Sequence, residues 1–290
     1  MSVTLRRLIF PLGVLMTLLS IPRCASAQGF LAQGDLGVTV GGMNYIGDLN
    51  HQRLDGAVRP AAGLFVRYRM GDRWAAALGV NYGHVVGGDP DIDRLRNLSF
   101  RSHVLEASLR MEFNFVPFGA DGYSFRTSPV LFVGVGFFHF NPQAQYYNAA
   151  TGRDEWVDLQ PLHTEGQGSE AYPNRVPYGL MQMALPFGVG FKMALSKDVT
   201  LAVEYGYRYT WTDYLDDVST TYVGGQVLGS GSLAEAMADR SGEVQTGYVN
   251  APGIQRGDDS LNDAYAFFNV SVTLSLETLF GWMRSKRCEH

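Results

Sequence analysis

Seven charged residues of mixed sign fall on stretches of the chain in which apolar and small residues alternate. They are Arg67, Glu106, Arg110, Glu112, Lys192, Glu204 and Arg208. Carboxylates form strong charge-assisted hydrogen bonds with guanidinium and ammonium groups, and a charge shielded from water is very costly unless it is paired. We therefore expect the three glutamates to pair with the basic residues in one closed network. A path for protons or ions is the functional alternative for the same residues.

A second group of polar residues follows two of these alternating stretches. It consists of Tyr45, Asp48, Asp213, Tyr214, Asp216 and Asp217. Tyrosine hydroxyls and carboxylates can bond to one another, so we expect these side chains to form a latch that ties neighbouring strand ends together at an outer rim. The aspartates could also bind calcium through oxygen ligands, but their spacing departs from that of an EF-hand loop. We expect no metal and no cofactor.

Histidine and serine residues near strand ends raise the possibility of a hydrolase. His84, His103 and His139 are candidates, and Ser99 and Ser102 lie close to His103 in sequence. A Ser–His mechanism also needs a third group that orients the histidine, and no spacing in the chain indicates such a triad. We therefore expect that the protein is not an enzyme.

The elements that must position these residues are β-strands, because hydrophobicity alternates with a period of two. The stretch 199–211 is the clearest example, since every odd position is Val, Leu, Tyr or Trp. The same pattern predicts eight strands, at 36–46, 60–70, 73–86, 98–115, 129–141, 180–195, 199–214 and 263–276. Several of them reach the roughly 9–11 residues that cross a bilayer at a tilt.

The connections between the expected strands are of two kinds. Residues 71–72 and 196–198 form short turns, and 116–128 is of intermediate length. The others are long, and 142–179 and 215–262 are rich in Gly, Ser, Asp and Gln, so we expect these two to be mobile or partly disordered. Short periplasmic turns and long outer loops are typical of outer-membrane barrels. The pattern predicts an all-β fold, an eight-stranded antiparallel transmembrane β-barrel.

Alternation alone does not say which face of the barrel points outward. A soluble barrel would hold its apolar face inside, but rings such as Trp74, Tyr205 and Trp211 would overfill the narrow lumen of eight strands. The opposite face carries Gly, Ala and the charged network, and an Arg facing lipid at mid-depth costs about 2–4 kcal/mol. We therefore expect the apolar face to meet lipid. We also expect two aromatic girdles on the apolar face, one at each membrane interface. The girdle at the outer interface consists of Tyr45, Tyr82, Phe140, Trp211 and Tyr214, and the girdle at the periplasmic interface consists of Tyr68, Trp74, Phe113 and Phe191.

The N-terminus has the features of an export signal. Arg6 and Arg7 precede an apolar run at 8–19, and Ala25-Ser26-Ala27 forms a small-residue cleavage site. We expect a signal peptide at 1–27, a barrel at 28–280 and a periplasmic tail at 281–290. The expected location is the outer membrane of a Gram-negative cell, with outer-membrane lipid as the surrounding partner.

Removal of the signal would change the composition of the mature chain. It would leave 20 Lys and Arg against 28 Asp and Glu, a formal net charge of −8. An acidic chain of this kind is a poor partner for nucleic acid. Cys288 would be the one remaining cysteine, which excludes an intramolecular disulfide and a thiolate zinc site.

Three segments resemble motifs of a known family. Gly41–Leu49 resembles its NYxGDL opening, Pro186–Lys192 is similar to its PxGxGxK strand, and Glu204–Ser219 is similar to its ExGxRxTxTDYLDDVS stretch. The third match is the most specific. The family is the PorG-like, DUF6089-type group of outer-membrane barrels of the type IX secretion system.

The resemblance implies a non-enzymatic component of the type IX protein-secretion machinery. In that system the barrel sits above a periplasmic ring built from a lipoprotein and its partner protein, so the periplasmic turns, above all 116–128, are the expected contacts. The long loops and the chain beyond the last strand depart from the family pattern. A stand-alone structural or adhesion barrel with a plugged lumen is the alternative, and co-purification of ring proteins would separate the two.

Overall fold

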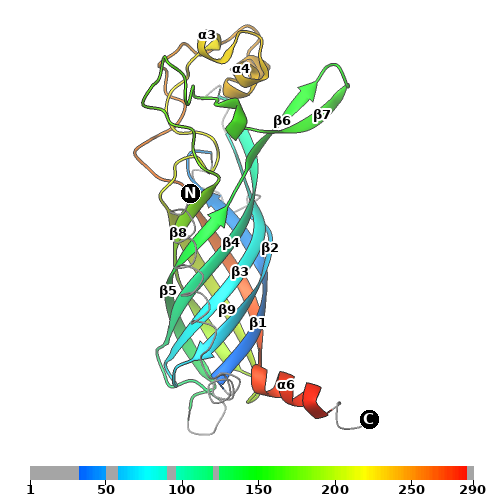
Figure 1. The fold of residues 1–290 in the computed structure, drawn as a ribbon, viewed down its shortest axis with the longest axis vertical. Coiled ribbons are helices and arrows are strands. Elements are labelled where there is room, and N and C mark those ends of the chain that lie inside the picture. The colour runs from blue at the N-terminus through cyan, green and yellow to red at the C-terminus, as the bar shows by residue number, and fades with distance from the viewer. Residues whose placement is uncertain (1–32, 50–57, 90–95, 120–123, 286–290) are drawn as a thin grey trace, which may run out of the picture.

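A computed structural model describes residues 33–49, 58–89, 96–119 and 124–285 of the 290-residue chain. The expected signal peptide lies outside the described residues. Eight long strands form the body of the molecule: β1 Gly34–Ile46, β2 Arg59–Arg69, β3 Trp74–Gly88, β4 Ser99–Asn114, β5 Thr127–His139, β8 Met181–Ala194, β9 Val199–Thr210 and β10 Ala264–Ser275. Each pairs antiparallel with its neighbours in the order β3-β2-β1-β10-β9-β8-β5-β4, and pairing of β3 with β4 closes the ring (Figure 1). The predicted eight-stranded antiparallel barrel is confirmed.

Two further strands extend beyond the barrel. β6 Pro142–Asn148 and β7 Arg153–Asp158 form a hairpin, and β6 pairs with β4 at Arg101 and Ser102. This hairpin projects to one side of the barrel at the end with the long loops (Figure 1). The sequence does not predict this hairpin, because its polar composition indicates one long loop over 142–179.

Short helices lie at the two ends of the barrel. They are η2 Gln160–Leu162, α3 Gly225–Leu228, α4 Leu233–Ala238, α5 Ser241–Val244 and, at the short-turn end, α6 Leu276–Ser285. In the described part of the chain no helix combines the length and the apolar character needed to cross a membrane. The last barrel strand ends at Ser275, where α6 begins; the expected division into domains stays a prediction.

The two faces of the wall differ in the way that the sequence predicts. Along β4, Glu106, Arg110 and Glu112 are buried while Leu105 and Leu109 are about half exposed. Trp74, Tyr82, Phe187, Phe191 and other large apolar side chains of neighbouring strands are also exposed. A belt of exposed apolar side chains on a folded barrel requires a lipid surrounding. The outward direction of the apolar face is therefore confirmed.

The expected rings of Trp74, Tyr205 and Trp211 lie outside, but the lumen also holds other large rings that the sequence did not place there. Phe65, Phe132, Phe138 and Phe267 are all buried inside the barrel. They fit because glycines stand opposite them: a Cβ built on Gly37 would lie 2.2 Å from the Phe65 ring. Missing side chains on one strand thus make room for aromatic side chains on another.

The expected outer aromatic girdle also needs correction. Tyr45 and Phe140 are fully buried and point into the outer mouth of the barrel rather than toward lipid. Tyr214 stacks on Tyr178 above the barrel, with ring centroids 4.7 Å apart. Tyr82 and Trp211 are exposed on the outer face, as predicted.

The two longest loops are folded, which corrects the expectation of mobility. Residues 159–180 and 211–263 form what we call the cap, which covers the outer end of the barrel (Figure 1). Its interior contains the ion pair of Arg256 with Glu165, and a small apolar cluster joins Leu159 and Met237 to Ala144 of β6. Polar composition misled the prediction, because these polar side chains bond to one another instead of to water.

Candidate functional site

The charged network in the lower half of the lumen is built around Glu112 of β4. Its Oε2 lies 2.8 Å from Nε of Arg67 on β2 and 2.6 Å from Nζ of Lys192 on β8. Its Oε1 lies 3.4 Å from Nη2 of Arg110, whose Nη1 reaches Oε2 of Glu204 at 3.0 Å. Four strands therefore contribute charges to one chain of ion pairs across the lumen.

A second ion pair lies nearer the outer end. Nε of Arg208 is 3.0 Å from Oε2 of Glu106. The hydroxyl of Tyr265 donates to the same carboxylate at 2.8 Å, and Nδ2 of Asn81 and Oγ of Ser108 donate to its Oε1 at 3.0 and 3.1 Å. Both carboxylate oxygens are satisfied, as a buried charge requires.

The structure places all seven residues of the expected network inside the barrel. Sequence reasoning missed Tyr265 and Asn81 as partners of Glu106. Asn81 was within reach of that reasoning, because it shares the inward face of its strand with Ala75 and Ala77. Tyr265 was not, because it bonds to a residue 159 positions away.

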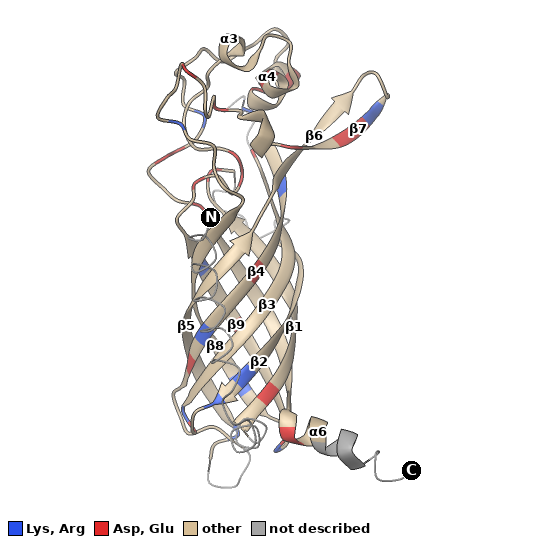
Figure 2. Ribbon diagram, viewed as in Figure 1, with Lys and Arg blue, Asp and Glu red and all other residues tan. Residues whose placement is uncertain are grey.

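These side chains leave little space in the middle of the lumen. A cavity of about 10 Å³ remains between Phe65, Arg110, Glu204 and Arg208, and a single water molecule needs roughly 10–15 Å³ on this measure. Figure 2 shows that most of the barrel ribbon carries no charged residue, while acidic and basic positions recur in the cap and toward the short-turn end. The described lumen is thus a filled interior and not a water channel.

At the outer rim, Tyr45 joins two carboxyl groups. Its hydroxyl oxygen lies 2.6 Å from Oδ2 of Asp216 and 2.6 Å from Oδ1 of Asp263. A hydroxyl has one proton, so it can donate to one carboxylate and must accept a proton from the other carboxyl group. Burial raises the pKa of Asp216 to about 8 and that of Asp263 well above its ordinary value, which supplies the protonated acid. Sequence reasoning missed Asp263.

Asp217 belongs to a different cluster, which we call the Arg256 centre. Its Oδ2 accepts from Thr164 at 2.5 Å, its Oδ1 accepts from Tyr178 at 2.7 Å, and Arg256 lies 3.6 Å away. Burial raises the pKa of Asp217 to about 6. Arg256 also pairs with Glu165 at 2.9 Å. This centre holds the cap together.

The other expected rim residues do not share one site. Oδ2 of Asp48 accepts from the backbone N–H of Asp258 at 2.7 Å, so it anchors the end of the cap. The hydroxyl of Tyr214 donates to Glu165 at 3.3 Å, which places it at the Arg256 centre. Asp213 is half-buried, and burial raises its pKa to about 8. Among the described residues, no three acidic, His or Cys side chains are arranged to hold a metal ion.

The histidine and serine candidates do not come together. Ser102 is buried and accepts from the N–H of Asn141 at 2.9 Å, while the adjacent His103 points to the outer face and lies 3.0 Å from the Tyr82 hydroxyl. Neighbouring residues of a strand face opposite sides of the sheet. Ser102 and His103 therefore cannot pair with each other.

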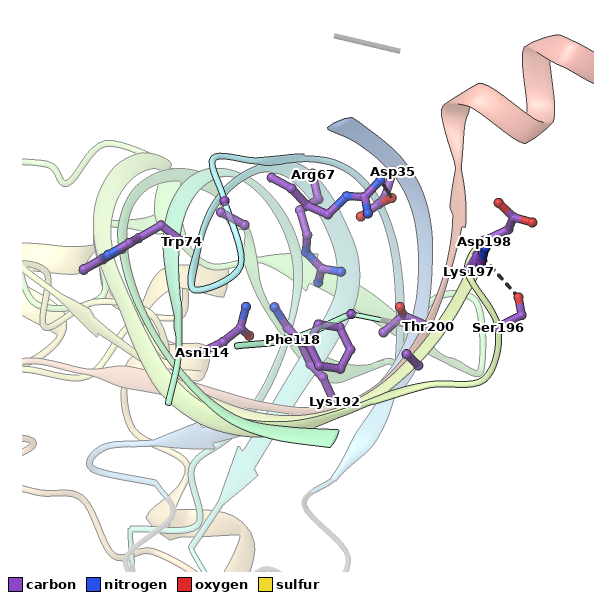
Figure 3. Close-up of a pocket in the computed structure, with 15 residues that line it drawn as sticks. Asp35, Arg67, Trp74, Asn114, Phe118, Lys192, Ser196, Lys197, Asp198 and Thr200 are labelled. Atoms are coloured by element: carbon purple, nitrogen blue, oxygen red, sulfur yellow. Dashed lines mark hydrogen bonds and ion pairs between the residues drawn. The ribbon is translucent and has the colours of Figure 1, made fainter. Parts of the chain in front are cut away.

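The short-turn end of the barrel holds a cavity of about 50 Å³ that sequence reasoning did not predict. Its charged lining residues are Arg67, Arg69, Lys192 and Lys197, together with Asp35 and Asp198. Figure 3 shows Arg67, Asn114, Phe118 and Lys192 extending into the space enclosed by the barrel wall. Phe118 belongs to the turn between β4 and β5, and its backbone N–H donates to the carbonyl of Asp72 at 2.9 Å. We call this space the short-turn cavity.

A family model described as "Domain of unknown function (DUF6089)" matches residues 12–159, just over half of the chain. The chain belongs to the DUF6089 family. The match covers the N-terminal half of the DUF6089 barrel, from which Arg67, Glu106, Arg110 and Glu112 of the network come. No curated protein matches the chain.

Solved outer-membrane proteins resemble this DUF6089 barrel at low identity. Neisserial surface protein A (NspA) is 12% identical, with 84% of this chain and 97% of that chain covered and a TM-score of 0.39. OprG from Pseudomonas aeruginosa is 12% identical, with 84% and 97% covered and a TM-score of 0.37. Ail of Yersinia pestis is 9% identical, with 83% and 98% covered and a TM-score of 0.36. Similarity this low carries no argument about function.

Proposed function

We propose that this protein is a non-enzymatic component of a type IX protein-secretion assembly in the Gram-negative outer membrane, where it contacts a periplasmic ring complex. The belt of exposed apolar side chains supports the location, because only lipid would cover it without a penalty. The three motif segments, which include Glu204 and Arg208 of the lumen, support the assignment to this system.

The observation that carries the proposal is the filled and capped barrel. Ion pairs occupy the lumen, and the cap closes its outer end, so transport through the barrel itself is disfavoured. A barrel that transports nothing through its lumen would function by binding other molecules at its two ends. Its periplasmic end offers a defined surface, since the N–H of Phe125 donates to the carbonyl of Pro117 at 2.8 Å and the Phe125 ring is 61% exposed.

Photo-crosslinking from the periplasmic turn tests the secretion role. We place a crosslinking amino acid at Phe125, a described position of the 116–128 turn; residues 120–123 lie outside the described part. The control carries the same group at Tyr147 on the outer hairpin, which is equally exposed at 61%. Capture of ring proteins at 125 and not at 147 is the expected result. Identical captures at both positions, or none at 125, would contradict the proposal.

The alternative is a stand-alone structural or adhesion barrel, and one observation favours it. The β6–β7 hairpin exposes Tyr147 and Trp156, and the guanidinium of Arg101 lies 3.5 Å from the centroid of the Trp156 ring. Exposed aromatic side chains on a projecting sheet are typical of binding surfaces. Under this alternative, deletion of 143–158 abolishes surface attachment and leaves protein secretion unchanged; under the favoured function, attachment is unaffected.

A further inference from the structure

The three histidines near the strand ends lie close together on the outward face of the barrel wall. His84 of β3 pairs in register with His103 of β4, and the centroids of their rings are 5.7 Å apart. His139 of β5 pairs with Leu105, the outward residue of β4 next to His103. Arg101 is the outward neighbour of His103 on its other side. We call these four residues, His84, Arg101, His103 and His139, the histidine patch.

The patch follows the apolar belt directly, on the side of the cap. On β3 the outward residues run from Trp74 through Leu78 to Tyr82, which are all exposed, and His84 comes next. At about 3.3 Å per residue the run from Trp74 to Tyr82 is roughly 26 Å long, and a tilt of about 40° reduces its height to roughly 20 Å. The apolar band of outer-membrane barrels is about 25 Å tall, so the patch lies at the level of the lipid head groups.

The described charges that act on His84 are all basic. They belong to His103, Arg59 and Arg101, and no carboxylate of the described residues is among them. Like charges repel one another, and the repulsion is stronger beside a membrane than in bulk water because the effective dielectric constant is lower. An anion bound among these residues would relieve the repulsion. The surroundings of His84 therefore favour an anionic ligand.

The guanidinium of Arg101 is held in position without an acidic partner. Its Nε donates to Oε1 of Gln143 at 3.0 Å, and its central carbon lies 3.5 Å from the centroid of the Trp156 ring. Asp158 accepts a hydrogen bond from Gln143 at 2.6 Å, and in the described structure no ion pair joins it to Arg101. The two Nη groups of Arg101 are left to donate to another acceptor, and a guanidinium fork matches the oxygens of a phosphate group.

The patch offers a further donor beside an apolar surface. The Tyr82 hydroxyl lies 3.0 Å from Nδ1 of His103. With that hydroxyl as the donor, His103 carries its own proton on Nε2 and can donate it to an anion. On the belt side of the patch, Leu105 and Phe137 are 49% and 55% exposed. A ligand at this place meets polar donors at one end and apolar side chains at the other, which suits a phosphorylated lipid better than a free anion.

We propose that the histidine patch binds the phosphate group of a lipid in the outer leaflet. Arg101 and the imidazoles of His84 and His103 donate to the phosphate oxygens, and the acyl chains lie on the belt against Leu105 and Phe137. The inference rests on the proposed location in the outer membrane, with the cap outside, and not on the secretion role.

Native mass spectrometry of the purified barrel, titrated with defined lipids in detergent, tests the site. The probes are bisphosphorylated lipid A, the same lipid A after enzymatic removal of its phosphates, and inorganic phosphate as a competitor, all at one ionic strength. The phosphorylated lipid should bind at least about tenfold more tightly than the dephosphorylated lipid, because charge-assisted hydrogen bonds are lost in the latter. Equal binding of the two lipids, or displacement of the phosphorylated lipid by millimolar inorganic phosphate, would overturn the proposal.

Variants of the patch locate the binding. The double variant His84→Leu with His103→Leu removes both imidazole donors, and Arg101→Gln removes the charge; each should weaken binding of phosphorylated lipid A by about tenfold. Arg101→Lys keeps the charge and should lose less. Arg153→Gln removes an exposed charge from the outer hairpin and is the matched control, with the affinity of the parent.

All of these variants should keep heat-modifiable mobility, because the altered side chains lie outside the packed interior of the barrel. Affinities of the patch variants equal to that of Arg153→Gln would refute the site. Equal losses in Arg101→Lys and Arg101→Gln would also count against it, since they would show that the charge is not what the lipid recognises.

The outcomes separate this inference from the proposed function. If position 125 captures ring proteins while the patch variants bind lipid A as the parent does, the lipid site is wrong and the secretion role stands. If the patch binds the phosphorylated lipid and position 125 captures no ring protein, the lipid site stands without the secretion role.

Discussion

At the scale of single residues, each buried charge of the lumen depends on specific partners. Glu106 has four partners from four different strands, and both of its oxygens are bonded. Among these partners only Arg208 is charged, so its loss leaves the buried carboxylate without a counter-charge. The cost is much larger than the value of one hydrogen bond, because the remaining charge stays shielded from water.

Substitution of Arg208 tests this dependence. Arg208→Ala should destabilise the barrel by about 3–5 kcal/mol, which is the usual cost of removing one partner of a buried ion pair and leaving the other charge unpaired. Glu204→Ala should also destabilise the barrel. The double variant Glu106→Gln with Arg208→Met should cost less, since no charge is stranded. Heat-modifiable mobility on gels and urea unfolding measure the effect. Unchanged mobility of the single variants would argue against a structural role for the network.

The Tyr45 cluster makes a prediction about pH. Asp216 has a pKa of about 8 in the folded protein against an ordinary value of 3.8. Between these values the folded state binds more protons than the unfolded state, so the stability of the cap should fall as pH rises from about 4 to about 8. Asp213 and Asp217, whose pKa values are raised to about 8 and about 6, act in the same direction.

Hydrogen exchange of the cap between pH 5 and pH 9, corrected for intrinsic exchange, measures this stability. The variant Asp216→Asn keeps a hydrogen-bonding group without a titratable proton, so its protection should change less with pH than that of the parent. A pH profile in the variant as steep as in the parent would show that Asp216 is not responsible.

At the scale of elements, the cap depends on the Arg256 centre more than on regular secondary structure. Its helices are short: α3 and α5 contain 4 residues each and α4 contains 6. Isolated helices of this length are unstable in water. Arg256 and Glu165 together bind backbone and side chains from three parts of the cap, including Ala238, Ser219 and Thr220.

Removal of Arg256 should therefore unfold the cap and leave the barrel intact. In Arg256→Ala, Glu165 and Asp217 lose their shared cation while remaining buried, at a local cost of about 3–5 kcal/mol. Limited proteolysis should cut within 159–180 and 211–263 at much lower protease concentrations than in the parent. The barrel core should keep its heat-modifiable mobility; loss of both together would mean that cap and barrel fold as one unit.

At the scale of the whole molecule, the barrel has a filled lumen and two chemically different ends. One end presents the cap and the β6–β7 hairpin, and the other presents short turns around a small cavity with charged lining residues. In the described part of the barrel, ion pairs and inward phenylalanines occupy the lumen between the two ends.

Electrical measurement tests this arrangement. The purified protein inserted in a planar bilayer should give no stable single-channel conductance, because the remaining lumen cavity is about 10 Å³. The double variant Phe65→Ala with Phe132→Ala would widen the lumen, so it serves as the positive control in which conductance is expected. A steady open pore in the parent protein would show that the ion pairs line a path instead of closing one.

Much of the fold could be predicted, while the pairing of the candidate site could not. The strand limits agree to within a few residues for most of the barrel, and residues such as Glu112 and Lys192 lie on the predicted inward face. Three features were wrong: Tyr45 and Phe140 point inward, the longest loops are folded, and part of one loop is a hairpin. The binding and latching roles of the site residues stay predictions.

The sequence by itself determined the strands and, for most strand residues, the side of the wall on which they lie. Both follow from the period-two geometry of an extended backbone, which is a local property. The tertiary structure alone decided the partners: Glu106 meets Tyr265, Glu112 meets Lys192, and Tyr45 meets Asp263. These contacts depend on strand stagger and on closure of the ring, which bring together residues far apart in the chain. For the same reason no local pattern predicted the cap, because the cap is stabilised by contacts between polar side chains that are far apart in the sequence.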